Sequence, residues 1–328
     1  MLLSKDLGID LGTENTLIAD RKGRILINEP SVVAVDIKTR RVLATGNEAK
    51  AMIGRTPGSI VAVKPLKDGV IADFDMTADM LHHFIYRSSK SSLFSKTRVV
   101  ISVPSGVTEV EKRAVEDAAR AAGAGDVELI EEPMAAAIGI GLPVYEATGS
   151  MIVNIGGGTC DIAVTSLGGI AAKKSIKVAG AGLDDAIINY MKKEHSLLIG
   201  MVTAEDIKLK IGSVSEYDGE GAINVSGRDL ETSLPKAIEV TSAEIRDVLT
   251  VEVDKIIEAI KDTLEVTLPE LAADIMDRGI YLTGGTALLR GLAQYIESKI
   301  GISVLVADKP LEAVVLGTAI KLRGVKHY

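Results

Sequence analysis

The stretch LGIDLGTENTLIAD, residues 7–20, decides the fold of this chain, because MIVNIGGGTCDIAVTSLGG, residues 151–169, repeats its pattern. Each stretch has an apolar strand, an Asp or Asn near its end, a tight loop with Gly and Thr, and a second apolar strand. Small loop residues let backbone N–H groups approach phosphate oxygens, and a carboxylate at a strand end can hold a hydrated divalent cation. The repetition therefore predicts two related domains that clamp a nucleotide between them.

The composition is typical of a globular cytoplasmic protein. The 328 residues are 47% apolar and 25% charged, and this length favours about two domains. A net charge of −8 argues against a surface that coats nucleic acid. Cys160 is the only cysteine, which excludes an internal disulfide and indicates a reducing compartment. No apolar run reaches the ~20 residues that a membrane span needs.

Strands alternate with helices along the chain, which predicts an α/β fold with a mixed sheet in each half. After an expected strand at residues 99–104, Thr108 and Glu111 form a capping box for a helix that Gly123 ends. Its predicted apolar stripe is Val110, Ala114, Ala118 and Ala121. Pro133 marks the first turn of the next helix.

The second half repeats this scheme. We expect a strand at 175–180, helices at 183–194, 203–213 and 243–264, and a strand, Gly turn and helix at 279–289. Residues 32–63 and 213–238 are less regular, and we interpret them as small subdomains inserted into the two α/β cores.

The motifs exclude two common nucleotide-binding folds, because neither a Walker A pattern nor a G-x-G-x-x-G between a strand and a helix is present. In its order of phosphate loop, helix pair, second phosphate loop and late TGG turn, the chain resembles the actin, Hsp70 and sugar-kinase superfamily. Within it, the chain resembles the bacterial actins of the MreB family over nearly its whole length. The most specific segments of this resemblance are NEPSVVA, IGRTPGSIVAVKPLKDGVIADF, IEEPMAAAIGIGLP, DDAIINY and PELAADIMDRGIYLTGGTALLRGL.

The resemblance implies an actin-like ATPase fold with ATP and Mg²⁺ in the cleft between two domains. It implies domain I at 1–145 and 308–328, with a subdomain at about 33–65, and domain II at 146–307, with a subdomain at about 183–243. The implied nucleotide-binding residues are Gly12, Thr13, Glu14, Asn15, Gly156, Gly157, Gly158, Glu205, Lys208, Gly284, Gly285, Thr286 and Ala287. Asp10 matches the carboxylate that holds Mg²⁺ through water, Asn154 takes the second metal position, and Glu131 matches the residue that orients the attacking water.

The chain departs from the family pattern where the chemistry would occur. Asn154 stands where the family has Asp, which removes a negative charge from the surroundings of a hard cation. Ala181, Glu14 and Thr286 are further departures beside the nucleotide. We expect weak ATPase activity and predict that the chain hydrolyses ATP more slowly than its Asn154→Asp variant. Tolerated drift, with water replacing the lost contacts, is the alternative interpretation.

Leu93 and Phe94 form an apolar pair in a loop rich in Ser and Lys. They match the loop by which proteins of this family insert into the inner face of the cell membrane. Lys90 and Lys96 would then meet anionic lipid headgroups, at ~1 kcal/mol each. The alternative is that both apolar side chains fold back onto the core.

The function implied by the resemblance is that of a membrane-associated cytoskeletal filament that directs cell-wall elongation. Its implied partners are further copies of the chain, the membrane, and elongation proteins such as RodZ and MreC. A non-polymerising ATPase or regulatory paralogue of the same superfamily is the alternative. A chaperone would need a further peptide-binding domain, and a sugar kinase would need a catalytic Asp, for which we find no distinct candidate.

Overall fold

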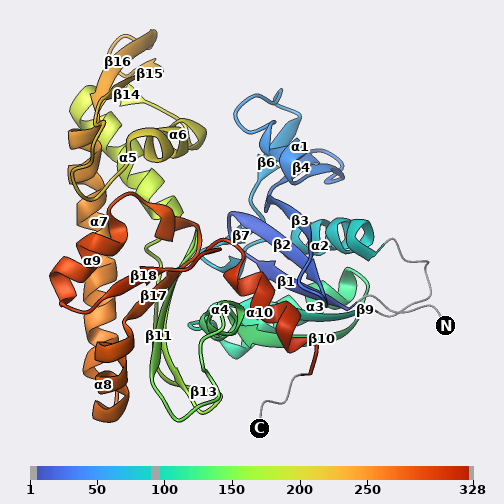
Figure 1. Ribbon diagram of the computed structural model, residues 1–328. Helices are drawn as coiled ribbons and strands as arrows, with labels where there is room; N and C mark the ends of the chain where they lie inside the picture. The colour runs from blue at the N-terminus through green and yellow to red at the C-terminus, as the bar shows by residue number, and fades with distance from the viewer. Residues whose placement is uncertain (1–5, 90–96, 325–328) are drawn as a thin grey trace.

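The structure is a computed structural model that describes residues 6–89 and 97–324. Two α/β lobes lie side by side, each built on a five-stranded sheet (Figure 1). The first sheet contains β1 (Leu7–Leu11), β2 (Asn15–Asp20), β3 (Ile25–Pro30), β9 (Thr97–Val103) and β10 (Ala124–Glu131). The second sheet contains β11 (Ser150–Ile155), β12 (Cys160–Ser166), β13 (Gly169–Ile176), β17 (Ile280–Thr283) and β18 (Val304–Val306).

The two sheets have the same topology. Written in the matching direction, their strand orders are β3-β2-β1-β9-β10 and β13-β12-β11-β17-β18. In each sheet an antiparallel hairpin, β1–β2 or β11–β12, pairs along its first strand with a parallel neighbour, β9 or β17. The two glycine-rich stretches found in the sequence are these two hairpins, so they occupy equivalent places in the two lobes.

Each lobe also carries a small sheet, and these lie at the upper ends of the lobes in Figure 1. The first contains β4 (Val33–Asp36), β5 (Val42–Thr45) and β6 (Ile60–Val63), beside α1 (Asn47–Lys50). The second contains β14 (Leu197–Leu198), β15 (Ala222–Asp229) and β16 (Pro235–Thr241). The first coincides with the irregular stretch 32–63, whereas the second only overlaps 213–238, because β14 lies before that stretch and β16 runs to Thr241. A short hairpin of β7 (Leu66–Lys67) and β8 (Val70–Ile71) follows the first small sheet.

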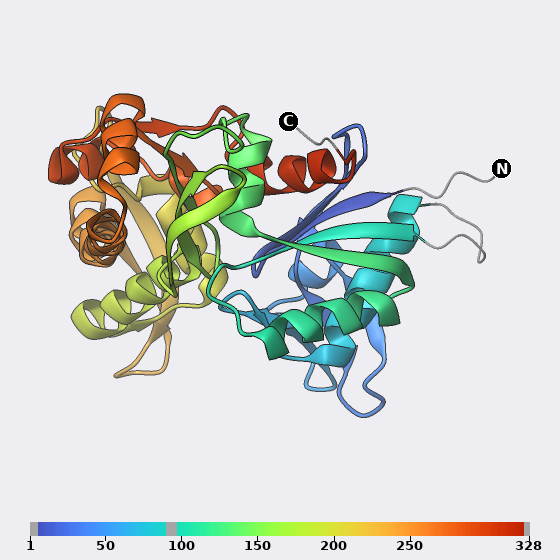
Figure 2. The same cartoon turned by 90° about the horizontal axis from the view of Figure 1, so that it is seen from below.

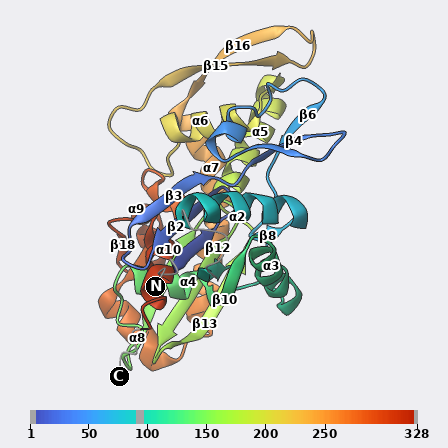
Figure 3. The ribbon, with the colours of Figure 1, turned by 90° about the vertical axis from the view of Figure 1, so that its right-hand side faces the viewer.

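Helices cover both faces of the first large sheet (Figures 2 and 3). Its helices are α2 (Phe74–Ser89) and α3 (Glu109–Ala121) on one face, and α4 (Glu132–Gly139) and α10 (Ala313–Lys321) on the other. Helices α4 and α10 approach closely, because a Cβ on Gly139 or Gly317 would overlap backbone of the facing helix. These two helices therefore form a tight junction beside the cleft.

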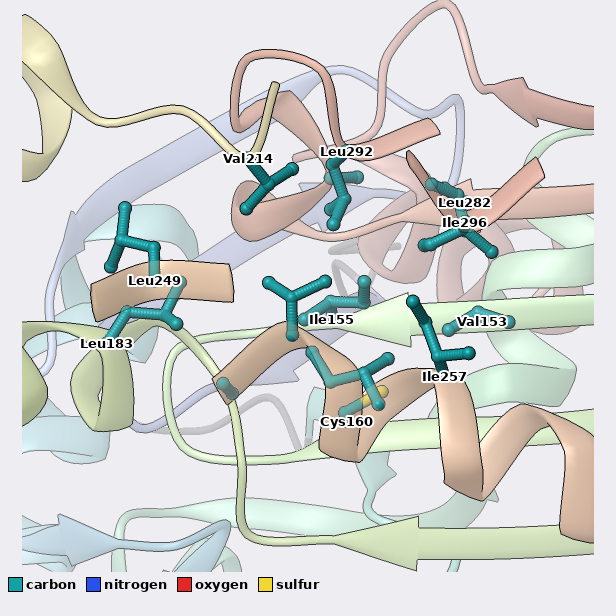
Figure 4. Close-up of a cluster of buried hydrophobic side chains, with 14 of the residues drawn as sticks. Val153, Ile155, Cys160, Leu183, Val214, Leu249, Ile257, Leu282, Leu292 and Ile296 are labelled. Carbon is teal, nitrogen blue, oxygen red and sulfur yellow. The ribbon is translucent and has the colours of Figure 1, made fainter. Parts of the chain in front are cut away.

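The core of the second lobe forms where β11 and β12 pack on a long helix (Figure 4). The helices of this lobe are α5 (Gly180–His195), α6 (Met201–Ile211), α7 (Ser242–Glu265), α8 (Pro269–Arg278), the 3₁₀ turn η1 (Gly285–Leu288) and α9 (Leu292–Ile300). Val153 and Ile155 of β11 pack in one buried cluster with Leu249 and Ile257 of α7. Cys160 is fully buried in the same cluster, as expected of a small apolar side chain.

Several local predictions are confirmed and others are wrong. The capping box of Thr108 and Glu111 is present. The predicted stripe on α3 is right at Ala118, which is buried, and wrong at Val110 and Ala121, which are exposed; the helix buries Val115 and Ala119 beside Ala118. The face is set by contact with the sheet and α2, which the sequence of one helix does not contain. The strand expected at 175–180 is also wrong, because β13 ends at Ile176 and α5 begins at Gly180.

Two expectations concern membranes. In the part of the chain that the structure describes, no helix combines the length and the apolar character needed to cross a bilayer. Leu93 and Phe94 lie outside the described residues.

Candidate nucleotide-binding site

A cavity of about 480 Å³ lies between the lobes and is lined by both glycine-rich hairpins. Its size lies within the usual range for small-molecule sites. The predicted residues that line it are Asp10, Gly12, Thr13, Glu14, Asn15, Asn154, Gly156, Gly157, Gly158, Glu205, Lys208, Gly284, Gly285 and Thr286. The structure thus brings together residues from widely separated parts of the chain. Ala287 is the exception among the predicted binding residues, because it is buried beneath the turn and does not line the cavity.

The loops of the two hairpins meet at one end of the cavity, which we call the phosphate end. Thr13 and Glu14 project from the first loop onto Gly158 and Gly157 of the second, where any Cβ would overlap them. The second loop therefore has to be glycine at these positions. Because glycine leaves the backbone uncovered, the loop offers N–H groups to an anion in the cavity.

Asp10 lies near the end of β1 and reaches the phosphate end as a half-buried carboxylate that lines the cavity. The Ser102 hydroxyl donates to its Oδ1 at 3.2 Å. Loss of solvent around the carboxylate raises the pKa of Asp10 to about 7, and the Ser102 hydrogen bond opposes this only in part. A carboxylate whose charged form is so weakly supported by the protein is well suited to a divalent cation.

Asn154 occupies the equivalent place on β11, but its amide is committed to neighbouring side chains. Its Nδ2 donates to Glu132 Oε2 at 2.9 Å, and its Oδ1 accepts from Thr283 Oγ1 at 3.2 Å. These two hydrogen bonds fix the orientation of the amide, because only Nδ2 can donate and only Oδ1 can accept. The side chain therefore orients Glu132, and Thr283 occupies one of the two lone pairs of its oxygen.

The structure places Glu132 at the cavity and leaves Glu131 outside it. Glu132 is buried and lines the cavity, whereas Glu131 faces away and accepts from Lys173 Nζ at 2.8 and 2.9 Å. The prediction that Glu131 orients water at the nucleotide thus selected the wrong one of two adjacent carboxylates. Neighbouring residues of an extended chain point in opposite directions, and Glu131 ends a strand.

Glu132 lies among other acidic groups. Burial raises its pKa well above the usual range, and the charges of Asp161 and Asp10 add to this effect, while the Asn154 hydrogen bond opposes it. A basic carboxylate near the phosphate end has the properties of a group that accepts a proton from water.

Asp161 is a buried acid that sequence reasoning missed. It lies on β12, and its Oδ1 accepts from the backbone N–H and the hydroxyl of Ser105, at 2.8 and 2.7 Å, across the lobes. Its Oδ2 has no hydrogen-bond partner among the described residues. The alternation of inward and outward side chains along β12 could have indicated that Asp161 points inward, but its partner Ser105 is distant in sequence.

The opposite end of the cavity, which we call the base end, is lined by α6 and the η1 turn. Lys208 Nζ lies 2.8 Å from Asp184 Oδ1 and donates to the Gly180 carbonyl at 2.8 Å. Burial raises the pKa of Asp184 to about 6, even though Lys208 opposes the shift. Glu205 accepts from Lys50 Nζ at 3.1 Å, which links α6 to α1 of the other lobe across the cavity mouth. The Thr286 hydroxyl donates to the Gly156 carbonyl at 2.9 Å and so joins the two ends.

The residues fit a nucleotide with a divalent cation. The glycine cradle could hold phosphates, and Asp10 supplies an oxygen ligand for a hard cation. No group of three or more His, Cys, Asp or Glu that could hold a metal occurs within 6–89 and 97–324. A cation at Asp10 would therefore complete its coordination with water and phosphate oxygens, as Mg²⁺ commonly does.

Comparisons of sequence match the chain to the MreB/Mbl family. The family model described as "MreB/Mbl protein" matches residues 4–328. The "Cell shape-determining protein Mbl" of Bacillus subtilis is 49% identical over 321 residues, which cover 98% of this chain and 96% of the relative. The "Cell shape-determining protein MreB" of Escherichia coli K12 is also 49% identical, over 96% of this chain and 92% of the relative.

Comparisons of structure agree. MreB 5 of Spiroplasma citri bound to AMPPNP has a TM-score of 0.93 and 39% sequence identity, and the match covers 98% of this chain and 97% of that one. The MamK double helical filament has a TM-score of 0.81, with 98% of this chain and 99% of that one covered, but only 22% identity, so it shows the fold alone. The chain has the actin-like fold and belongs to the MreB/Mbl family.

Proposed function

We propose that this MreB/Mbl-family chain is an ATP-binding bacterial actin that assembles into filaments and helps to determine cell shape. The observation that carries this proposal is the cavity between two equivalent glycine-rich hairpins. Support comes from relatives named as cell shape-determining proteins and from the Spiroplasma structures bound to AMPPNP and ADP.

In this proposal the two ends of the cavity bind different parts of the nucleotide. The backbone N–H groups of the two loops hold the phosphates, and Asp10 and its waters hold Mg²⁺. Glu205 and Lys208 lie along the adenosine, and the turn at Gly284 and Gly285 lies under it. When bound, Mg²⁺ neutralises phosphate charge as it develops. Closure of the lobes around the ligand would be the signal that the filament responds to.

We further propose that ATP hydrolysis is slow, and that Asn154 is the cause. Glu132 is the described carboxylate best placed to orient water, but one of its oxygens already accepts a hydrogen bond from Asn154. A carboxylate held in this way orients water less freely, and the missing charge at position 154 weakens the hold on the cation.

Self-association is proposed from the positions of exposed apolar residues on the second lobe. Leu230 and Leu234 lie at the turn between β15 and β16, and Val266, Leu268 and Met276 lie at α7 and α8. These groups lie at opposite ends of the lobe (Figure 1). Different patches at opposite ends suit a head-to-tail contact, which generates an open filament rather than a closed dimer. MamK, which has the same fold, forms a double helical filament.

The nucleotide and filament proposals are tested together by calorimetry and electron microscopy. We expect ATP with Mg²⁺ to bind the wild-type chain and filaments to form on its addition. Leu234→Asp and Val266→Asp should abolish the filaments without loss of nucleotide binding, whereas Val251→Asp, an exposed position on α7, should leave them intact. Binding without filaments in the wild type would favour the non-polymerising alternative.

A membrane-associated role rests on the sequence alone. We propose that Leu93 and Phe94 contact the inner face of the cell membrane, where the filament would meet elongation proteins such as RodZ and MreC. Pelleting with liposomes of anionic lipid tests this, because a Leu93→Ser, Phe94→Ser double variant should remain in the supernatant. Unchanged pelleting of the double variant would discard this loop as the anchor.

A further inference from the structure

We infer that Lys64 is an additional phosphate-binding residue, which contacts the terminal phosphate of a bound nucleoside triphosphate and is held by Glu14 until that phosphate arrives. The inference rests on the proposed nucleotide site and adds to it a residue that distinguishes triphosphate from diphosphate. It is carried by the charges of the cavity and by the contacts of the segment that contains Lys64.

The described lining of the cavity is strongly acidic. Its carboxylates are Asp10, Glu14, Glu132, Asp184 and Glu205. Its only two cations, within the same described lining, are Lys208 and Arg290. A nucleoside triphosphate would bring further negative charge into this cavity. Favourable binding at the phosphate end therefore needs cationic groups beyond a single divalent metal.

Both lining cations are committed at the base end. Lys208 is held by Asp184 and by the Gly180 carbonyl. Arg290 donates from Nη1 to the Gly212 carbonyl at 3.2 Å, and its guanidinium lies 5.3 Å from the centre of the Tyr217 ring. Neither cation is free to neutralise phosphates between the hairpins.

Lys64 brings a cation to the phosphate end from outside the lining. It follows β6, and its ammonium forms an ion pair with the Glu14 carboxylate. About a quarter of each side chain is exposed, so solvent screens this pair only in part. Glu14 in turn lies directly against Gly157 of the second phosphate loop. The ammonium is thus tied to the residue that separates the two loops.

The segment after Lys64 is anchored to the same loop by a second contact. The backbone N–H of Gly69, in the turn between β7 and β8, donates to Thr13 Oγ1 at 2.9 Å. Lys64 and Gly69 therefore contact the adjacent residues Glu14 and Thr13, while Asp68 lies 3.8 Å from Lys177 of the other lobe. This arrangement restricts where the ammonium can move, since its backbone is attached to the phosphate loop.

A terminal phosphate between the loops would compete directly with Glu14. Its oxygens carry more negative charge than one carboxylate, and a lysine ammonium binds phosphate as a compact point charge. Lys64 would exchange the Glu14 carboxylate for a phosphate oxygen, and Glu14 would leave Gly157. A diphosphate lacks the group that drives this exchange, so the pair would stay closed.

The test is to measure dissociation constants for ADP and for AMPPNP with Mg²⁺, by competition against a fluorescent adenine nucleotide. For Lys64→Gln we expect AMPPNP to bind roughly tenfold more weakly and ADP to change by less than about twofold, since a charge-assisted hydrogen bond is lost only with the triphosphate. Lys64→Arg should bind AMPPNP nearly as the wild type does. Glu14→Gln should bind AMPPNP more tightly, because a competing negative charge is removed.

Lys67→Gln is the matched control, because Lys67 is exposed on β7 and does not line the cavity. It should leave both constants unchanged, and thermal melting checks that each variant is folded. An equal effect of Lys64→Gln on the binding of ADP and AMPPNP, or no effect on either, would overturn the role of Lys64 but would leave the proposed function standing. If the wild-type chain bound neither nucleotide, the proposed function would fail together with this inference.

Discussion

The hairpins β1–β2 and β11–β12 are built alike, yet they contribute different chemistry to the cleft. Asp10-Leu11-Gly12 in the first corresponds to Asn154-Ile155-Gly156 in the second, and each polar residue lies just before the loop. The first hairpin carries a half-buried carboxylate and large loop side chains, Thr13 and Glu14. The second carries a neutral amide and glycines.

The two copies of the duplicated hairpin therefore supply different groups to the site. The hairpin with glycines leaves its backbone open to an anion, and the hairpin with Asp10 provides the charge for a cation. The side chains of the first loop fill the space that the glycines of the second leave empty. Changes that make the two hairpins more alike should therefore lower activity or affinity where a carboxylate or a glycine is lost, and raise activity where a carboxylate is gained.

The largest effect is expected when the first hairpin is made like the second. Asp10→Asn removes the carboxylate proposed to hold the cation, and we expect Mg²⁺-dependent phosphate release to fall by at least roughly a hundredfold, because a metal ligand is worth several kcal/mol. Asp126→Asn, an exposed site on β10, is the control. The double variant Asp10→Asn, Asn154→Asp keeps the total charge. Wild-type activity in the double variant would contradict the account, because it would show that the carboxylate serves equally well on either hairpin.

A smaller loss is expected when the second loop is given a side chain. Gly157→Ala places a Cβ within the space of Glu14, and overpacking of this kind costs roughly 1–3 kcal/mol, so ADP, with which Glu14 stays against Gly157, should bind to the displaced loop about tenfold more weakly. Glu14→Gly in the same background should restore most of the affinity. Gly182→Ala is the control, since its Cβ would meet no atom within 4 Å. A failure of Glu14→Gly to rescue would mean that the loops do not interlock as described.

The converse change makes the second hairpin like the first. Asn154→Asp removes the amide that donates to Glu132 and adds a negative charge near the cation, and we expect phosphate release to rise by roughly threefold to tenfold. A steady-state assay with both proteins at saturating ATP decides the matter. Equal rates would indicate that the departure at position 154 is without consequence for turnover.

The smallest effect concerns the base end, where the titrating group, Asp184, lies on α5 and not on either loop. Burial raises the pKa of Asp184 from 3.8 to about 6. Between these two pH values, Asp184 of the folded ligand-free chain therefore holds a proton that the unfolded chain has released. This contribution to stability is present at low pH and is lost as the pH rises through 6, by roughly 1 kcal/mol between about pH 5.5 and pH 7.5. Urea unfolding measured at several pH values should show that the free energy of unfolding falls less steeply with pH for Asp184→Asn than for the wild type. Parallel profiles would contradict the assignment.

The sequence predicts the parts of this molecule that depend on neighbours along the chain. The duplicated hairpins and the capping box of Thr108 and Glu111 are local patterns, and the structure confirms both. The buried face of α3 depends instead on the sheet and on α2, and therefore the predicted stripe is right at Ala118 but wrong at Val110 and Ala121.

The site shows the same limit at the level of single side chains. Glu131 and Glu132 are adjacent, and only the end of β10 decides which of them reaches the cavity. Asp161 gains its significance from Ser105, and Lys64 from Glu14, at separations of 56 and 50 residues. No local pattern encodes such pairs, because they form only when the lobes and their loops come together.

A crystal structure with AMPPNP and Mg²⁺ tests the central claim most directly. We expect the phosphates between the loops of β1–β2 and β11–β12, the cation beside Asp10, and the adenosine between α6 and the η1 turn. A ligand bound elsewhere, with the cavity between the two hairpins empty, would contradict the account.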